Sequence, residues 1–217
     1  MGHVIVIANQ KGGCGKTTIA LGLAGILGEE GLEALLVDAD PQGSVVRWRG
    51  VRSEGSIPFH VVAMPAPILH AEVPKLRHKY DMILIDCPPG GPAGAESITR
   101  SALAVADLVL VPIQPSAFDL WSGEGMAEMI ARARSSNAGL RAYIVISRRI
   151  VGTAIGDEAR EAARSIGLPV CRAEIAQRVA LAEASVAGRT VSGLAPHSAA
   201  TKELRLLVKE LRKCLSA

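Results

Sequence analysis

NQKGGCGKTT, residues 9–18, is the stretch of sequence that decides the fold. The β-branched run HVIVIAN (3–9) precedes it and an apolar helical pattern over 16–29 follows it, so a glycine-rich turn joins a strand to a helix. Such a turn directs several backbone N–H groups and the positive end of the helix dipole at an anion. The stretch therefore predicts a phosphate-binding loop.

The residue types within the loop support this interpretation. Glycines at positions 12, 13 and 15 would let the backbone approach the phosphates. Lys16 would neutralise the charge of the phosphates, and the hydroxyl of Thr17 would hold Mg²⁺. The loop nevertheless departs from the general pattern G-x-x-x-x-G-K-[ST], because position 10 is Gln10 instead of glycine and a second lysine, Lys11, precedes the glycines. Taken alone, the loop leaves open a glycine-rich turn that binds no ligand.

The rest of the chain alternates strands with helices. Runs rich in Val, Ile and Leu are separated by helical patterns, as in the βαβ units of a parallel sheet that is buried on both faces. The expected strands cover 3–9, 33–39, 59–64, 81–87, 107–113, 141–147 and 168–172, and the expected helices lie near 16–29, 43–51, 68–79, 95–105, 118–135, 156–166, 178–187 and 197–215. We therefore expect the α/β fold class: a single-domain P-loop NTPase with a mainly parallel, doubly wound β-sheet flanked by helices. The domain is expected to span 1–217, without an N-terminal helix-turn-helix domain.

Two further strands end in carboxylates. The run ILID ends at Asp86, and an apolar strand that closes on an acid is a usual way to present a ligand to Mg²⁺. The run VDADPQG carries Asp38 and Asp40, which lie on the same side of an extended chain. An alternative role for either residue is a helix N-cap or a turn residue before Pro41. Parallel sheets bind ligands at the carboxyl ends of their strands, where all three acids are expected.

At these motifs the sequence resembles the ParA/MinD ATPases. NQKGGCGKTT is similar to their deviant Walker A motif KGGxxGKT, VDADPQG to their switch I, and MILIDCPPG to their Walker B and switch II. The resemblance continues through VPIQPSAFDLWSGEGM (111–126), ISRRIVG (146–152) and IAQRVALAEASVAGRTV (175–191), where the short plasmid-partition ParA proteins match best.

The resemblance implies roles for individual residues. Lys11 would cross the interface of an ATP-bound homodimer to reach the partner's nucleotide, whereas Lys16 would act in its own subunit. Asp40 would position or activate the attacking water, Asp38 would support the Mg²⁺ environment, and Asp86 would bind Mg²⁺ through water. The nucleotide-binding residues would be Lys11, Gly12, Gly13, Cys14, Gly15, Lys16, Thr17, Thr18, Ser147 and Arg148, the last two on the adenine side. The cofactors implied are ATP and Mg²⁺, and the activity is a weak ATP hydrolysis that a partner stimulates.

The distribution of charge along the chain indicates what kind of partner the protein could bind. Residues 1–140 hold 11 Lys/Arg against 14 Asp/Glu, whereas residues 141–217 hold 13 against 7. The partition relatives bind DNA without sequence preference when dimerised, through phosphate contacts of basic residues in this C-terminal part. The candidate DNA-binding residues are Arg160, Arg164, Arg178, Lys202 and Arg205. The alternative is a solvated face, because acids at 158, 161, 203 and 210 dilute the patch.

The last helix, within TKELRLLVKELRKCL (201–215), carries an apolar stripe that leaves three possibilities open: packing against its own domain, contact with DNA or a partner, or a MinD-type membrane anchor. No apolar run approaches the roughly 18 residues of a membrane span, and the N-terminus lacks a signal-peptide layout. We expect a cytoplasmic, nucleoid-associated protein that does not bind membranes.

Two classes of function remain in view. The first is a cargo-positioning ATPase that partitions a plasmid, a chromosome or another cargo together with a ParB-like adaptor. The second is a metabolic P-loop enzyme of the same superfamily, such as a dethiobiotin or cobyrinic-acid synthetase, which would transfer a phosphoryl group to a small substrate and would not need Lys11 in trans.

Overall fold

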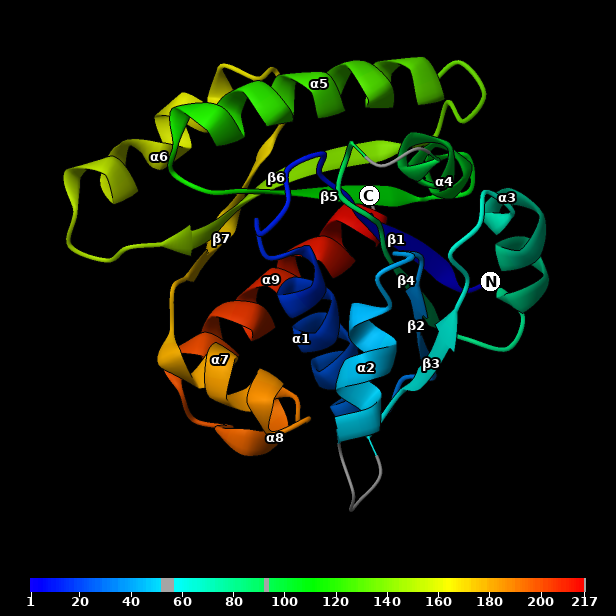
Figure 1. Cartoon of the computed structure of the whole chain (residues 1–217), viewed down its shortest axis with the longest axis horizontal. Helices are drawn as coiled ribbons and strands as arrows, with labels where there is room; N and C mark the ends of the chain where they lie inside the picture. The colour runs from blue at the N-terminus through cyan, green and yellow to red at the C-terminus, as the bar shows by residue number, and fades with distance from the viewer. Residues whose placement is uncertain (52–56, 92–93, 217) are drawn as a thin grey trace.

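The computed structural model describes residues 1–51, 57–91 and 94–216 (Figure 1). Its strands are β1 (His3–Ile7), β2 (Ala34–Asp38), β3 (His60–Ala63), β4 (Met82–Asp86), β5 (Leu108–Ile113), β6 (Arg141–Arg149) and β7 (Val170–Ala176). Its helices are α1 (Lys16–Glu29), α2 (Ser44–Val51), α3 (Leu69–Glu72), the 3₁₀ helix η1 (Val73–Leu76), α4 (Ala95–Leu103), α5 (Ala117–Ala133), α6 (Ala154–Arg164), α7 (Val179–Val186), α8 (Val191–Leu194) and α9 (Ala199–Ser216). None of these helices is long and apolar enough to cross a membrane.

The strands form one seven-stranded sheet in the order β3-β2-β4-β1-β5-β6-β7, and all neighbours are parallel. The first strand is central, so the chain winds away from it in both directions. The loop after β1 therefore lies at the point where the strand order reverses, which is where open α/β sheets bind their ligands. The predicted fold class is confirmed.

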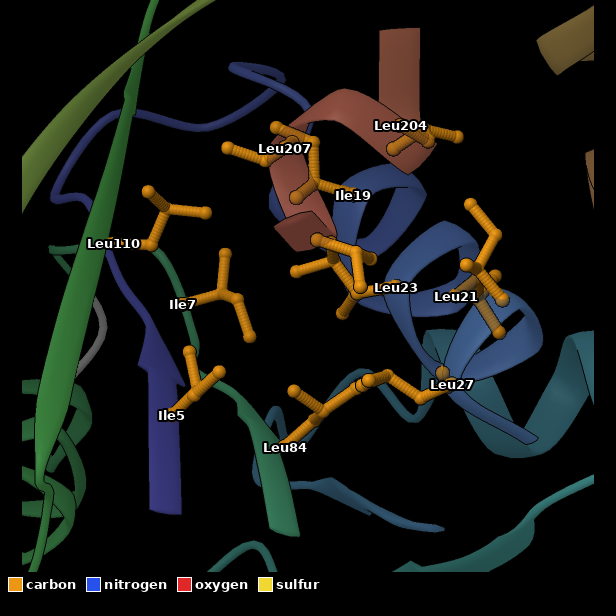
Figure 2. Packing of buried hydrophobic residues seen from close by; sticks show 14 of the residues in the cluster. Ile5, Ile7, Ile19, Leu21, Leu23, Leu27, Leu84, Leu110, Leu204 and Leu207 are labelled. Atoms are coloured by element: carbon orange, nitrogen blue, oxygen red, sulfur yellow. The ribbon is translucent and has the colours of Figure 1, made fainter. Parts of the chain in front are cut away.

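Alternating side chains of the strands supply two cores, one on each face of the sheet. In β1, Ile5 and Ile7 point to the face covered by α1, α2, α7, α8 and α9, whereas Val4 and Val6 point to the face covered by α3, α4, α5 and α6. Figure 2 shows the first core, in which strand side chains meet leucines and isoleucines of α1 and α9. Burial on both faces explains why the inner strands β1, β2, β4 and β5 are apolar between their ends.

The structure differs from the expected elements in three places. The predicted helix 68–79 is a short α3 followed by the 3₁₀ helix η1, because Pro74 lacks the N–H that a continuing α-helix requires. The last strand covers Val170–Ala176 instead of 168–172. The short helix α8, capped by the Thr190 hydroxyl, was not predicted.

The last helix packs against its own domain. Its apolar side chains Leu204, Leu207, Val208, Leu211 and Leu215 are buried in the core shared with α1. The acids of α9 also turn inward. Glu203 accepts a hydrogen bond from the Ala176 N–H at 3.0 Å, and Glu210 accepts from the N–H groups of Arg172 and Ala173 at 2.7 and 2.9 Å. These carboxylates satisfy backbone donors of β7, the edge strand of the sheet.

Candidate nucleotide-binding site

The phosphate loop links β1 to α1 with the backbone geometry that an anion site needs. Gly13 and Gly15 have φ angles of 76° and 91°, a left-handed region that favours glycine. Lys16 is the first residue of α1, so the loop delivers its side chain at the positive end of the helix dipole. Its ammonium group donates to the Lys11 carbonyl at 2.8 Å and is buried. The loop thus holds a cation and a set of backbone donors at one place.

The candidate Mg²⁺ site joins the start of α1 to the end of β4. The hydroxyl of Thr17 donates to Asp86 Oδ2 at 2.7 Å, and Asp86 Oδ1 is buried without a hydrogen-bond partner in the described residues. Burial raises the pKa of Asp86 to about 7, with the nearby Asp38 charge adding to the rise. A buried carboxylate with a free oxygen next to a threonine hydroxyl is a donor set that suits Mg²⁺, which takes its other ligands from phosphates and water. The residues present therefore fit the ion.

This carboxylate yields a prediction about stability. Between pH 4 and 7 the folded protein retains the Asp86 proton that the unfolded chain has lost, so the free energy of unfolding is expected to fall as the pH rises through this window. At pH 8, Asp86→Asn is expected to stabilise the nucleotide-free protein by about 1 kcal/mol or more while it weakens Mg²⁺-dependent nucleotide binding. Thermal unfolding in EDTA at pH 5 and pH 8 checks the first part. An equal Tm difference between variant and wild type at both pH values would reject it.

Asp38 lies beside Asp86, because the two residues are register partners on the adjacent strands β2 and β4. Its Oδ2 accepts from the N–H groups of Val45 and Val46 at 2.9 and 3.0 Å, and its Oδ1 accepts from the Asp40 N–H at 3.3 Å. Oδ2 thus binds backbone donors at the start of α2, and Oδ1 binds one in the turn before it. Asp38 organises the segment that carries Asp40, and its part in the Mg²⁺ environment stays a prediction.

Asp40 is in the turn after β2. One carboxylate oxygen accepts from the Gln42 N–H at 2.9 Å, and the Gly43 N–H closes the turn on the Asp40 carbonyl. No protein donor binds the other carboxylate oxygen in the ranges that the structure covers. The side chain is half-buried at the carboxyl end of the sheet, so an acceptor remains available for water.

Lys11 is held within its own subunit. Its ammonium group forms an ion pair with Asp119 Oδ2 and lies 3.5 Å from the Ser116 hydroxyl. The Asp119 side chain is fully buried, whereas that of Lys11 is 32% exposed. Asp119 also accepts from the Ser116 hydroxyl and from the Gln114 N–H at 3.3 Å. Consequently Lys11 must leave a buried carboxylate before it can act on another molecule.

The sequence contained a signal for part of this arrangement. Ser116 caps α5 by accepting from the Asp119 N–H at 3.2 Å, and S-x-x-D before an apolar run is typical of a helix start. The pattern gives the helix boundary but not the contact with Lys11, because the partner is 108 residues away. Asn9 was also missed; its side-chain amide donates to the Pro112 carbonyl at 2.7 Å. Both contacts tie the phosphate loop to the junction of β5 and α5.

A cavity of about 700 Å³ opens beside the start of α1. Its lining includes Gly15, Thr18, Ser147 and Arg148, which were all predicted to bind nucleotide, together with apolar residues of α1 and α7. Its size and largely apolar walls suit a nucleobase. Ser147 and Arg148 do more than line it, because both donate hydrogen bonds to carbonyls of the phosphate loop, at 2.6 and 3.2 Å.

Cys14 fills space under the loop. It is fully buried, its thiol donates to the Lys11 carbonyl at 3.4 Å, and burial raises its pKa. A thiol in this setting stays protonated, which supports a packing role over a redox role.

The predicted DNA-binding arginines take part in ion pairs. Arg160 contacts Glu174, Arg164 contacts Glu161, Arg178 contacts Glu203 and Arg205 contacts Glu29. Lys202 is exposed and forms no ion pair within the described residues. The structure therefore separates these five residues into four with neutralising neighbours and one without, and their contact with DNA stays a prediction.

Comparison with known proteins agrees with this geometry. Residues 5–191 match the family described as the CobQ/CobB/MinD/ParA nucleotide binding domain. The chain is 30% identical over 211 residues to Maintenance of carboxysome distribution protein A of Halothiobacillus neapolitanus, with 95% of each protein covered. It is 32% identical to the chromosome-partitioning ATPase Soj of Thermus thermophilus, with 95% of this chain and 94% of Soj covered. The fold is similar to that of Cyanothece apo McdA, with a TM-score of 0.82, 21% identity, and coverage of 97% of this chain and 100% of McdA.

Proposed function

The chain belongs to the CobQ/CobB/MinD/ParA family of nucleotide-binding proteins, and from this we propose that it is a ParA-like positioning ATPase that dimerises around ATP and is released by hydrolysis. The observation that carries the proposal is the pair of lysines in one phosphate loop. Lys16 points into the loop, whereas Lys11 points away from it toward Asp119. A cation that is not needed within its own loop could serve the nucleotide of a second subunit once it leaves Asp119.

Each group of residues in this site would have its own role in phosphoryl transfer. The loop N–H groups and Lys16 would hold the phosphates, Thr17 and Asp86 would hold Mg²⁺, and Asp40 would orient the attacking water. Mg²⁺ supplies positive charge that stabilises the transferring phosphoryl group. Lys11 would add charge stabilisation from the opposite subunit, so that turnover depends on dimerisation as it does with an arginine finger.

The proposal is tested by measuring mass in solution. Light scattering after gel filtration should give a monomer without nucleotide or with ADP, and a dimer with Mg²⁺ and ATP. A monomer under all three conditions, at concentrations where ATP is bound, would refute the positioning function. The metabolic alternative predicts phosphoryl transfer to a small substrate that is independent of the mass, and the same experiment separates the two.

The names of two relatives support a proposal about the class of cargo. One relative is named for carboxysome distribution and another for chromosome partitioning. We propose that this protein positions a cargo of that kind, a plasmid, chromosome or protein body, through a ParB-like adaptor that stimulates hydrolysis. Pull-down of the ATP-bound dimer with proteins encoded beside its gene tests this part.

The outer face of α9 supports DNA binding. Its exposed residues are Ala199, Lys202, Arg205, Leu206, Lys209, Arg212, Lys213 and Ser216, which include five cations and no acid. Glu203 and Glu210, which would dilute this charge, are bound to β7. Arg205 pairs with Glu29, the last residue of α1, and Arg212 pairs with its C-cap Glu30, which leaves three lysines without ion pairs among the described residues. Such a stripe suits phosphates of a polyanion and carries no base readout.

This stripe gives a prediction for nucleoid binding. Replacing Lys202, Lys209 and Lys213 together by glutamine is expected to weaken binding of the ATP dimer to non-specific DNA and to reduce the slope of log K against log salt by about 2 to 3. Binding is measured by fluorescence anisotropy at several salt concentrations. The matched control replaces Lys75, Lys79 and Arg132, three exposed cations outside α9, and should leave the slope unchanged. Equal slopes for both triple variants would contradict a DNA contact at α9.

A further inference from the structure

The Gly13 carbonyl of the phosphate loop receives two side-chain donors from neighbouring strands. Gln114 Nε2, just after β5, and Arg148 Nη1, near the end of β6, each lie 3.2 Å from this oxygen. The next carbonyl, that of Cys14, accepts from the Ser147 hydroxyl at 2.6 Å. Two consecutive carbonyls of the loop are therefore held on its outer side.

Fixing these carbonyls also fixes the N–H groups that follow them. A peptide unit is planar and trans, so the Cys14 N–H points opposite to the Gly13 carbonyl, and the Gly15 N–H points opposite to the Cys14 carbonyl. Such N–H groups are the donors with which a phosphate loop holds its ligand. Gly13 has a left-handed φ and no side chain, so its own conformational preference does little to fix this orientation.

The backbone conformation of Arg148 supports the same role for its side chain. Its φ of 51° makes it the one residue other than glycine with a positive φ in the part of the chain that the structure describes. This conformation costs about 1 kcal/mol for a residue with a side chain. The Arg148 side chain is exposed, and Gln114 is half-buried, so neither hydrogen bond contributes much to folding. The strained residue places a guanidinium group on the loop.

We propose that Gln114 and Arg148 are positioning residues that clamp the Gly13 peptide and orient the loop N–H groups for the nucleotide phosphates. This role is new for Gln114, and it replaces a base contact as the main role of Arg148. It rests on the nucleotide site of the proposed function, but it needs only a monomer that binds ADP.

Binding of ADP, GDP and inorganic pyrophosphate to the monomer distinguishes the two roles. Pyrophosphate has no base, so loss of a base contact leaves its affinity unchanged, whereas loss of loop orientation weakens it together with ADP. For Gln114→Ala, the Kd values of ADP and pyrophosphate are expected to rise about three- to tenfold, the effect of one hydrogen bond, and the ratio of ADP to GDP affinity should not change. Titration calorimetry measures ADP and GDP, and displacement of a fluorescent ADP measures pyrophosphate.

Matched variants separate the clamp from other effects. Gln177 lines the candidate nucleobase cavity together with Arg148 but makes no hydrogen bond to the loop within the described part of the chain, so Gln177→Ala should leave pyrophosphate binding unchanged. Arg148→Gly and Arg148→Ala both remove the guanidinium group and should weaken ADP equally, although the glycine variant should have the higher Tm because it accepts a positive φ. Arg148→Lys keeps the charge and should recover part of the loss.

Several results would overturn the proposal. One is an unchanged pyrophosphate Kd in Gln114→Ala, and another is an altered ADP to GDP ratio in Arg148→Ala. Wild-type protein that binds ADP but never dimerises would refute the positioning ATPase and leave the clamp standing. Wild-type protein that binds neither ADP nor pyrophosphate would refute both.

Discussion

Lys11→Ala is expected to abolish ATP-dependent dimerisation and with it DNA retention and stimulated hydrolysis, while the monomer still binds ATP. Lys16 and the loop N–H groups remain in place in this variant, so the phosphates keep their contacts within the subunit. What is lost is the charge that would reach across to the partner's nucleotide. Gel filtration with light scattering, combined with calorimetric ATP binding, measures both quantities. A Lys11→Ala protein that dimerises like the wild type would eliminate the role of Lys11 in trans.

Asp119→Asn is the matched variant with the opposite expected effect. Asp119 is fully buried and neutralises Lys11 within the subunit, so the nucleotide of a partner must compete with it for the lysine. Asparagine has nearly the same shape, its Oδ1 can still accept from the Gln114 N–H, and its Nδ2 can donate to the Ser116 hydroxyl, but it removes the ionic competitor. Half-maximal dimerisation is therefore expected at an ATP concentration several-fold lower. A higher concentration would mean that Asp119 prepares Lys11 for the partner and does not restrain it.

Asp40→Asn is expected to lower the turnover of ATP by about 10²-fold or more, the usual range for removing a group that orients or deprotonates water. The ATP-bound dimer should accumulate on DNA, because hydrolysis is the release step. Asparagine keeps the acceptor for the Gln42 N–H and therefore the turn, so the loss can be assigned to the carboxylate charge.

Phosphate release and DNA retention in the same samples check this prediction. The control is Asp81→Asn, which removes a carboxylate at the opposite, amino end of the sheet, where it accepts from the Glu33 N–H. This variant should keep wild-type turnover. Unchanged turnover in Asp40→Asn would reject its role in orienting water, and loss of turnover without accumulation of a dimer would reject hydrolysis as the release step.

Much of the fold could be predicted because its signals are local. Buried parallel strands require apolar residues on both faces, so the inner strands are visible as apolar runs in the sequence. The phosphate loop was equally visible, since only closely spaced glycines allow its backbone conformation. Two boundaries were predicted wrongly. At η1 the prediction overlooked that Pro74 ends the α-helix, and at β7 the extent of an edge strand depends on its contacts with β6 and α9.

Parts of the candidate site could not be predicted, because they depend on contacts between distant segments. The sequence places Asp38 and Asp86 at strand ends, but only the register of β2 with β4 puts them side by side, and only the start of α2 shows that Asp38 is engaged by backbone N–H groups. In the same way, the sequence suggested that Glu203 and Glu210 dilute the basic charge of α9. In the structure both carboxylates bind backbone N–H groups of β7 instead.

The sequence by itself determined the chemistry of this protein: an α/β nucleotide-binding fold, a phosphate loop with two lysines, and acids at the ends of its strands. These follow from local spacing, since neighbouring residues along a strand or turn have fixed relative directions. The tertiary structure alone decided which charges meet. It pairs Lys11 with Asp119, directs Gln114 and Arg148 onto Gly13, and leaves the lysines of α9 on the surface. Electrostatic interactions act over a few ångströms of space and not along the chain, so such pairings exist only once the chain has folded.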